Sequence, residues 1–121
     1  MSNHRANLPD LVVVSATGTT STSNVLSGMF DDAVGITIFA PQTLSHVFQV
    51  QVARHLDVAT SSTSWATAMS GGQIVTISAG QAVTYLSGAI GSLRVSSQGV
   101  EATTNGSLTR VFGINKQFNV A

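Results

Sequence analysis

The chain has 121 residues, only 8% of them are charged, and its formal net charge at pH 7 is zero. This length predicts one domain with a single core, and the absence of cysteine excludes disulfides and thiolate metal sites. The balanced charge gives no electrostatic footprint for nucleic acid, and no apolar run is long enough to cross a bilayer. A free soluble domain carries about 25% charged residues, so this composition favours a protein that rests against other protein subunits.

The first third of the chain predicts three strands. Residues 11–14 are mostly β-branched and indicate a short buried strand, whereas residues 15–24 are of low complexity and are expected to form a loop. A second short strand is expected within residues 25–30. Residues 34–40 predict a third strand, which Pro41 ends because proline cannot donate to a ladder.

The clearest strand in the sequence covers residues 46–52. Apolar and polar side chains alternate there with a period of two, which is typical of a strand with one buried face. The apolar face consists of Phe48, Val50 and Val52, and the polar face contains Gln49 and Gln51.

The second half predicts further short strands separated by turns. Residues 65–69 are expected to form one strand, and Ser70, Gly71 and Gly72 follow in a turn. Residues 74–77 and 82–86 are expected to pair as a hairpin with a four-residue loop. The last two strands have inward residues Leu93 and Val95 in 93–96, and Phe112, Ile114 and Phe118 in 109–118. Asn105-Gly106 is a type I′ turn signal before the last strand.

Many short strands at regular spacing, with no sustained helical period, predict an all-β fold. We expect a single-domain β-sandwich of jelly-roll-like form, with an immunoglobulin-like sandwich as the alternative. The polar residues 1–8 are expected to form a flexible N-terminal arm, because they have little apolar surface to bury. Residues 9–121 are then the sandwich domain.

The sequence offers weak candidates for metal sites. His46, His55 and Asp57 could bind zinc, but a strand start and a loop explain them more simply. The pair Asp31-Asp32 could supply oxygens to calcium, yet no alternating oxygen series follows it, and a turn explains the pair. We expect no metal and no cofactor.

Catalytic patterns are also missing from the sequence. No G-x-S-x-G nucleophile elbow occurs, and glycosidase chemistry needs paired carboxylates, whereas four of the five acidic residues fall in predicted loops or turns. We therefore expect that the protein is not an enzyme.

Three stretches have a strand texture that resembles a known family: LPDLVVVSATGTTSTSNVLSGMFDDAVGITIFAP, GGQIVTISAGQAVTYL and LRVSSQG. They resemble the small β-sandwich capsid decoration, or cement, proteins of tailed bacteriophages, over most of the chain from Leu8 to Phe118. The resemblance is one of pattern, without a diagnostic motif, and it transfers no contact residue by position.

The resemblance implies a virion protein on the outer capsid surface, made in the host cytoplasm. Its partner would be the major capsid protein, and it would self-associate as a dimer or trimer, without contacting nucleic acid or membrane. Possible capsid or subunit contacts are the residues of the N-terminal segment and two aromatic residues, namely Arg5, Leu8, Pro9, Phe30 and Trp65.

Two other functions fit the same composition. A neck, tail or fibre-base protein of the virion would use the same sandwich. A carbohydrate-binding module would need exposed aromatic rings near polar loops, and Trp65 and Tyr85 are the candidates for that role.

Overall fold

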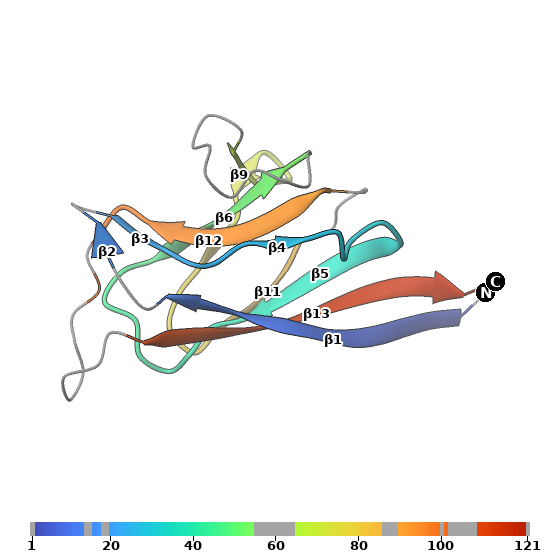
Figure 1. Cartoon of the computed structure of the whole chain (residues 1–121), viewed down its shortest axis with the longest axis horizontal. Coiled ribbons are helices and arrows are strands. Elements are labelled where there is room, and N and C mark those ends of the chain that lie inside the picture. The colour runs from blue at the N-terminus through green and yellow to red at the C-terminus, as the bar shows by residue number, and fades with distance from the viewer. Residues whose placement is uncertain are drawn as a thin grey trace.

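The computed structural model describes residues 2–13, 16–17, 20–54, 65–85, 90–99, 101 and 109–120. Over these residues the chain is all-β, and two antiparallel sheets pack against each other as the two layers of a sandwich (Figure 1). The predicted single-domain β-sandwich is therefore confirmed.

One layer is a four-stranded sheet. Its strands follow the order β1 (Ser2–Val13), β13 (Arg110–Val120), β5 (Ala33–Phe39) and β11 (Ala82–Tyr85). β1 and β11 are thus the edge strands of this sheet. In Figure 1, β1 and β13 run side by side to the end of the molecule where both chain termini lie.

The other layer is a seven-stranded sheet made of shorter strands. Its main order is β10 (Thr76–Ile77), β6 (Phe48–Ala53), β12 (Ser92–Ser97), β3 (Thr20–Thr22) and β2 (Ala16–Thr17). Two more strands join beside this path, β4 (Leu26–Ser27) on β12 and β7 (Ala66–Thr67) on β6.

A separate two-stranded hairpin pairs β8 (Met69–Ser70) with β9 (Gln73–Ile74). Its turn contains Gly71 at φ 59° and Gly72 at φ 80°. Two consecutive positive φ values are what a two-residue hairpin turn of type I′ requires, and glycine adopts them without steric cost. The predicted turn is therefore confirmed at Gly71 and Gly72, whereas Ser70, which was also expected in the turn, belongs to β8 and pairs with Gln73.

The strand order is that of a jelly roll. Counted in chain order, the main strands are β1, the β3–β4 pair, β5, β6, β10, β11, β12 and β13, so the two sheets have the orders 1-8-3-6 and 5-4-7-2. Each sheet alternates strands from the two halves of the chain, as two Greek keys folded together do. An immunoglobulin-like sandwich has a different order.

The core lies between the two sheets and contains the residues predicted for it. Phe48, Val50, Leu93, Val95 and Phe112 are 0% exposed and Ile114 is 3% exposed. The rings of Phe48 and Phe112 meet across the sandwich with centroids 5.1 Å apart. Two predicted inward residues are less buried, since Val52 only packs partly against the core and Phe118 lies beyond it.

Serine and threonine hydroxyls connect β12 to its neighbours. Thr22 bonds Ser96 through their hydroxyls at 3.1 Å, and Ser27 bonds Ser92 at 2.8 Å. Cross-strand hydroxyl pairs of this kind stabilise sheets, and they satisfy polar groups of Ser92 and Ser96, which are buried. Part of the high serine content thus serves the sheet itself.

The predicted hairpin of residues 74–77 and 82–86 is wrong. β10 pairs with β6 in one sheet, whereas β11 pairs with β5 in the other. The connecting turn crosses between layers, and it is held by hydrogen bonds from the Gly80 N–H to the Pro41 carbonyl and from the Ala40 N–H to the Gln81 carbonyl. Local turn signals cannot distinguish such a crossing from a hairpin.

Two predicted irregular segments contain strands. Residues 2–8, expected to be an arm, form the first half of β1 and pair in register with residues 114–120. Within 15–24, expected to be a loop, β3 pairs with β12 and β2 pairs with β3. In both segments backbone groups of a neighbouring strand provide the partners, which an apolar pattern does not reveal. Asn105-Gly106 lies outside the described residues.

Candidate interaction face

The outer face of the four-stranded sheet is built from cross-strand rows. Directly opposite residues share a face, so the ladder pairs place one polar row across all four strands, consisting of Thr84, Thr37, Asn115 and Asn7. The Thr37 and Thr84 hydroxyls bond each other at 3.0 Å. The row is uncharged, and within it Thr37 is 9% exposed and Asn115 is half-buried.

An apolar patch adjoins this polar row. Ala82 lies opposite Phe39, Phe39 lies opposite Gly113, and Val111 lies opposite Val12. Phe39 is 44% exposed and Val111 is 41% exposed. We call Val12, Phe39, Ala82 and Val111 the outer patch. A Cβ at Gly113 would sit 3.7 Å from the Cβ of Phe39. Because glycine has no side chain, no side chain of β13 projects beside Phe39 at this position.

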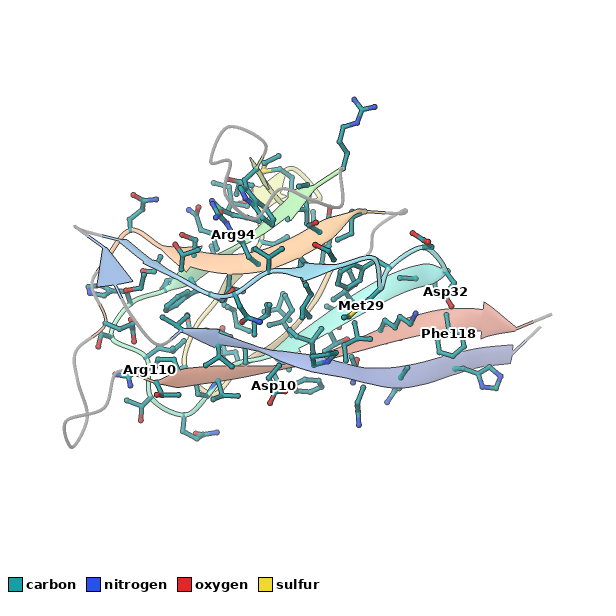
Figure 2. All side chains as sticks on the ribbon, viewed as in Figure 1. Asp10, Met29, Asp32, Arg94, Arg110 and Phe118 are labelled. Atoms are coloured by element: carbon teal, nitrogen blue, oxygen red, sulfur yellow. The ribbon has the colours of Figure 1, made fainter. Side chains whose placement is uncertain are left out.

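Charge on this face is confined to the edge strand. Arg5 lies opposite Gln117 and shares its face with Asn7. Figure 2 shows Asp10 projecting from β1 on the side away from the seven-stranded sheet. Arg5 and Asp10 are the charged side chains that the described residues place on this face, and both belong to β1.

The five predicted contact residues do not form one site. Arg5 and Pro9 are exposed on β1, and Leu8 is half-buried and packs against the core. Phe30 is 0% exposed, so its side chain belongs to the core and a surface contact is the wrong role for it. Trp65 lies on the other layer, where the guanidinium of Arg94 sits 4.3 Å from its ring centroid.

The two aromatic rings considered for a carbohydrate-binding module lie in different surroundings. Trp65 is half-buried beneath Arg94, whose Nε also donates to Gln51 at 2.7 Å. Burial of the guanidinium lowers the pKa of Arg94. Tyr85 is half-buried and packs against the core from β11. Both rings thus have contacts within the protein, and both stay partly exposed.

A groove of about 400 Å³ opens at one end of the seven-stranded sheet. It is lined by both polar and apolar groups, and no carboxylate, ammonium or guanidinium group is among the lining residues His46, Val47, Gln49, Thr76, Ser97, Gln98 and Gly99. A Cβ at Gly99 would lie 2.4 Å from Cδ2 of His46, so glycine is what lets the imidazole pack against this backbone.

A buried ion pair fixes the backbone beneath the groove. Glu101 and Arg110 have side chains 0% and 4% exposed, and the Arg110 Nε lies 3.0 Å from Glu101 Oε1. The same carboxylate accepts the N–H groups of Ser45 at 2.8 Å and His46 at 3.0 Å. Three chain segments thus converge on one carboxylate, which is a structural role.

A second ion pair lies near the other end of β13. The Lys116 ammonium donates to Asp32 at 2.6 Å and to the Met29 carbonyl at 3.0 Å. The hydrogen bond from Lys116, assisted by its charge, lowers the pKa of the Asp32 carboxyl. Figure 2 shows Met29, Asp32 and Phe118 gathered at this end, where Phe118 also stacks on His4 with ring centroids 5.7 Å apart.

The sequence offered a zinc candidate and a calcium candidate, and the described residues contain no cluster that would form either site. Within the part of the chain that the structure describes, no three residues of the types His, Cys, Asp and Glu come together as a metal site. His55 and Asp57 lie outside that part, so the zinc alternative is not tested. In the same part, no helix has the length and apolar character to span a membrane.

The outer patch was not predicted, although the sequence contains its signal. In the segment VGITIFA the core residues Ile36 and Ile38 share one face, which places Phe39 on the other. Val111 likewise alternates with Phe112. An aromatic residue in a strand is expected in the core by default. The alternation of side chains along the strand shows that Phe39 faces outward instead.

Comparison with known proteins adds no relative, since no protein-family model and no curated protein matches the sequence. The structural class of the protein therefore rests on its jelly-roll fold, and its function has to be inferred from the surfaces described above.

Proposed function

We propose that this protein is a non-enzymatic virion structural protein that binds the outer surface of a phage capsid and stabilises contacts between major capsid protein subunits. The observation that carries the proposal is the outer face of the four-stranded sheet. In the described part of the chain, this face has an exposed apolar patch, an adjoining uncharged polar row, and charged side chains along one edge, on β1.

Such a face suits docking onto protein. Interface centres are depleted in Lys, Glu and Asp, and the outer patch and polar row contain none of them. Docking through Thr, Asn, Val and a single Phe immobilises fewer flexible side chains than docking through Lys or Glu, so less conformational entropy is lost.

The composition of the whole chain supports the same function. Only 8% of its residues are charged, and its strand pattern resembles that of capsid decoration proteins. A binder that contacts several capsid subunits at once gains affinity by avidity and needs no active site. Its binding energy then adds to the stability of the lattice that it bridges.

The test is reconstitution on phage heads prepared without the protein. Wild-type protein should co-sediment with the heads and raise the temperature at which they release DNA. Phe39→Ser should bind at least about tenfold more weakly, since it removes the largest exposed apolar side chain of the face.

Ile74→Ser is the matched control for this experiment. Ile74 is 47% exposed, close to the 44% of Phe39, but it lies on the separate β8–β9 hairpin. It should bind as the wild type does. Equal loss in both variants would refute docking through the outer patch. Absence of binding to heads, with recovery from tails, would favour a neck or tail protein instead.

A further inference from the structure

Hydrogen bonds show which backbone N–H and C=O groups of β1 point to its open edge, away from β13. The Val12 N–H donates to the Asn24 side-chain oxygen at 2.6 Å, and the Val12 carbonyl accepts the Asn24 N–H at 3.2 Å. Val12 therefore points its backbone groups away from β13, and its ladder partner Val111 does not bond to β1.

The direction of the backbone N–H and C=O groups alternates along β13. This alternation identifies which residues of β1 face the open side beyond the bulge between Leu8 and Leu11. Because Val111 faces away from β1, residues 112, 114, 116 and 118 face towards it, and they bond to their partners in β1. The residues between those partners, Asn3, Arg5 and Asn7, then direct their N–H and C=O groups to the open side. Asn24 covers the edge at Val12, and no hydrogen bond among the described residues covers it at 2–8.

This edge differs from the other edges of the sandwich. β11 has 4 residues, and β10 and β2 have 2 residues each, so they offer little template for pairing. β1 pairs regularly from Ser2 to Leu8. Edge strands are usually protected by lysine, proline or a bulge. Here Pro9 and the bulge between Leu8 and Leu11 protect only the second half of β1.

Antiparallel pairing of β1 with its own copy has one register that fits these groups. Residues whose backbone faces the open side must pair with each other, so the centre falls on a whole residue. A centre on His4 would leave Asn7 without a partner among the ladder residues 2–8, so the centre is on Arg5, Ala6 or Asn7. A centre on Arg5 would oppose two like charges, and a centre on Asn7 would place Pro9, which lacks an N–H, opposite Arg5. A centre on Ala6 pairs Arg5 with Asn7 in both directions. Pro9 then lies opposite Asn3, at the end of the ladder.

We propose that the protein forms a two-fold dimer by antiparallel pairing of β1 with β1 of a second copy, centred on Ala6. The two four-stranded sheets then join into one continuous sheet. The strand is self-complementary, because its cation Arg5 and its anion Asp10 share the outer face towards opposite ends. In the register centred on Ala6, Arg5 lies opposite Asn7 and Asp10 lies opposite Ser2, so antiparallel pairing places no like charges opposite each other.

The dimer depends on β1 alone and not on the proposed capsid binding. A two-fold axis perpendicular to the joined sheet keeps both outer patches on the same side. If the protein binds a capsid, the dimer presents two docking patches to one surface, and their binding is bivalent.

The experiment measures mass against concentration by light scattering and sedimentation. Wild-type protein should approach twice the 12.5 kDa of one chain. Asn7→Lys places a second cation opposite Arg5 of the other copy, twice per dimer, and should weaken association at least about tenfold. The charge swap Arg5→Glu with Asn7→Lys should restore it, since each pair then has opposite charges.

Gln73→Lys is the control, with the same charge added to an exposed position on the separate β8–β9 hairpin, away from β1 and from the outer patch. It should leave dimerisation unchanged. A wild-type chain that stays monomeric or forms trimers would overturn the dimer, whether or not it binds capsids. A dimer insensitive to Asn7→Lys, or not restored by the charge swap, would overturn the β1 interface. Dimerisation without capsid binding would leave this interface standing and refute only the proposed function.

Discussion

Replacing Phe112 with alanine tests whether the two sheets pack as described. Phe112 is 0% exposed and its ring meets that of Phe48 across the sandwich at 5.1 Å. Removing a fully buried phenylalanine costs about 3–5 kcal/mol, because transfer free energy is lost and a cavity remains. The total stability of a domain is about 5–15 kcal/mol, so the variant should lose a large share of it.

Phe39→Ala is the matched comparison, since it makes the same chemical change on a neighbouring strand. Phe39 is 44% exposed, so truncation removes about half of the roughly 2 kcal/mol that full burial contributes, or about 1 kcal/mol. A double-mutant cycle of Phe48 and Phe112 should also give a coupling of about 0.5–1.5 kcal/mol from the ring contact.

The assay is urea unfolding followed by circular dichroism, with the free energy extrapolated to water. The Phe112 variant should unfold at a much lower urea concentration than the Phe39 variant. Similar midpoints for the two variants would show that Phe112 is not in a closed core. The register of β13, and with it the assignment of the outer patch, would then be wrong.

Two further predictions concern the ion pairs. Glu101→Ala should cost about 3–5 kcal/mol in urea unfolding, because it breaks a buried ion pair and removes the carboxylate that accepts two backbone N–H groups; a loss below about 1 kcal/mol would contradict the buried pair. NMR titration should place the Asp32 pKa below 3.8, and Lys116→Met should raise it, with no change refuting the contact. The folded-state pKa is the lower one, so this pair stabilises the fold above the unfolded-state pKa and less as pH falls through the folded-state value.

Alternation made much of the sandwich predictable. Phe48 and Val50, and later Phe112 and Ile114, each follow a period of two, and the structure buries all four. A sheet with one face on the core imposes this period on any sequence that forms it. Proline also marked a strand end correctly, since β5 ends at Phe39, just before Pro41.

Pairing partners could not be predicted in the same way. Residues 76–77 and 82–85 lie close in sequence, yet they belong to different sheets. Residues 2–8 have little apolar character, but each has a ladder partner in β13. Which strands meet depends on contacts between distant segments, and a local pattern contains no information on them.

The interaction face shows the same division. Strand parity already places Phe39 opposite in direction to Ile36 and Ile38, and composition alone indicates a surface poor in charge. Only the tertiary structure brings Val12, Phe39, Ala82 and Val111 together and leaves the edge of β1 open at residues 2–8. The physical reason is that side-chain direction is set locally by the period of the strand, whereas a patch or an open edge exists only after distant strands have hydrogen-bonded in one order.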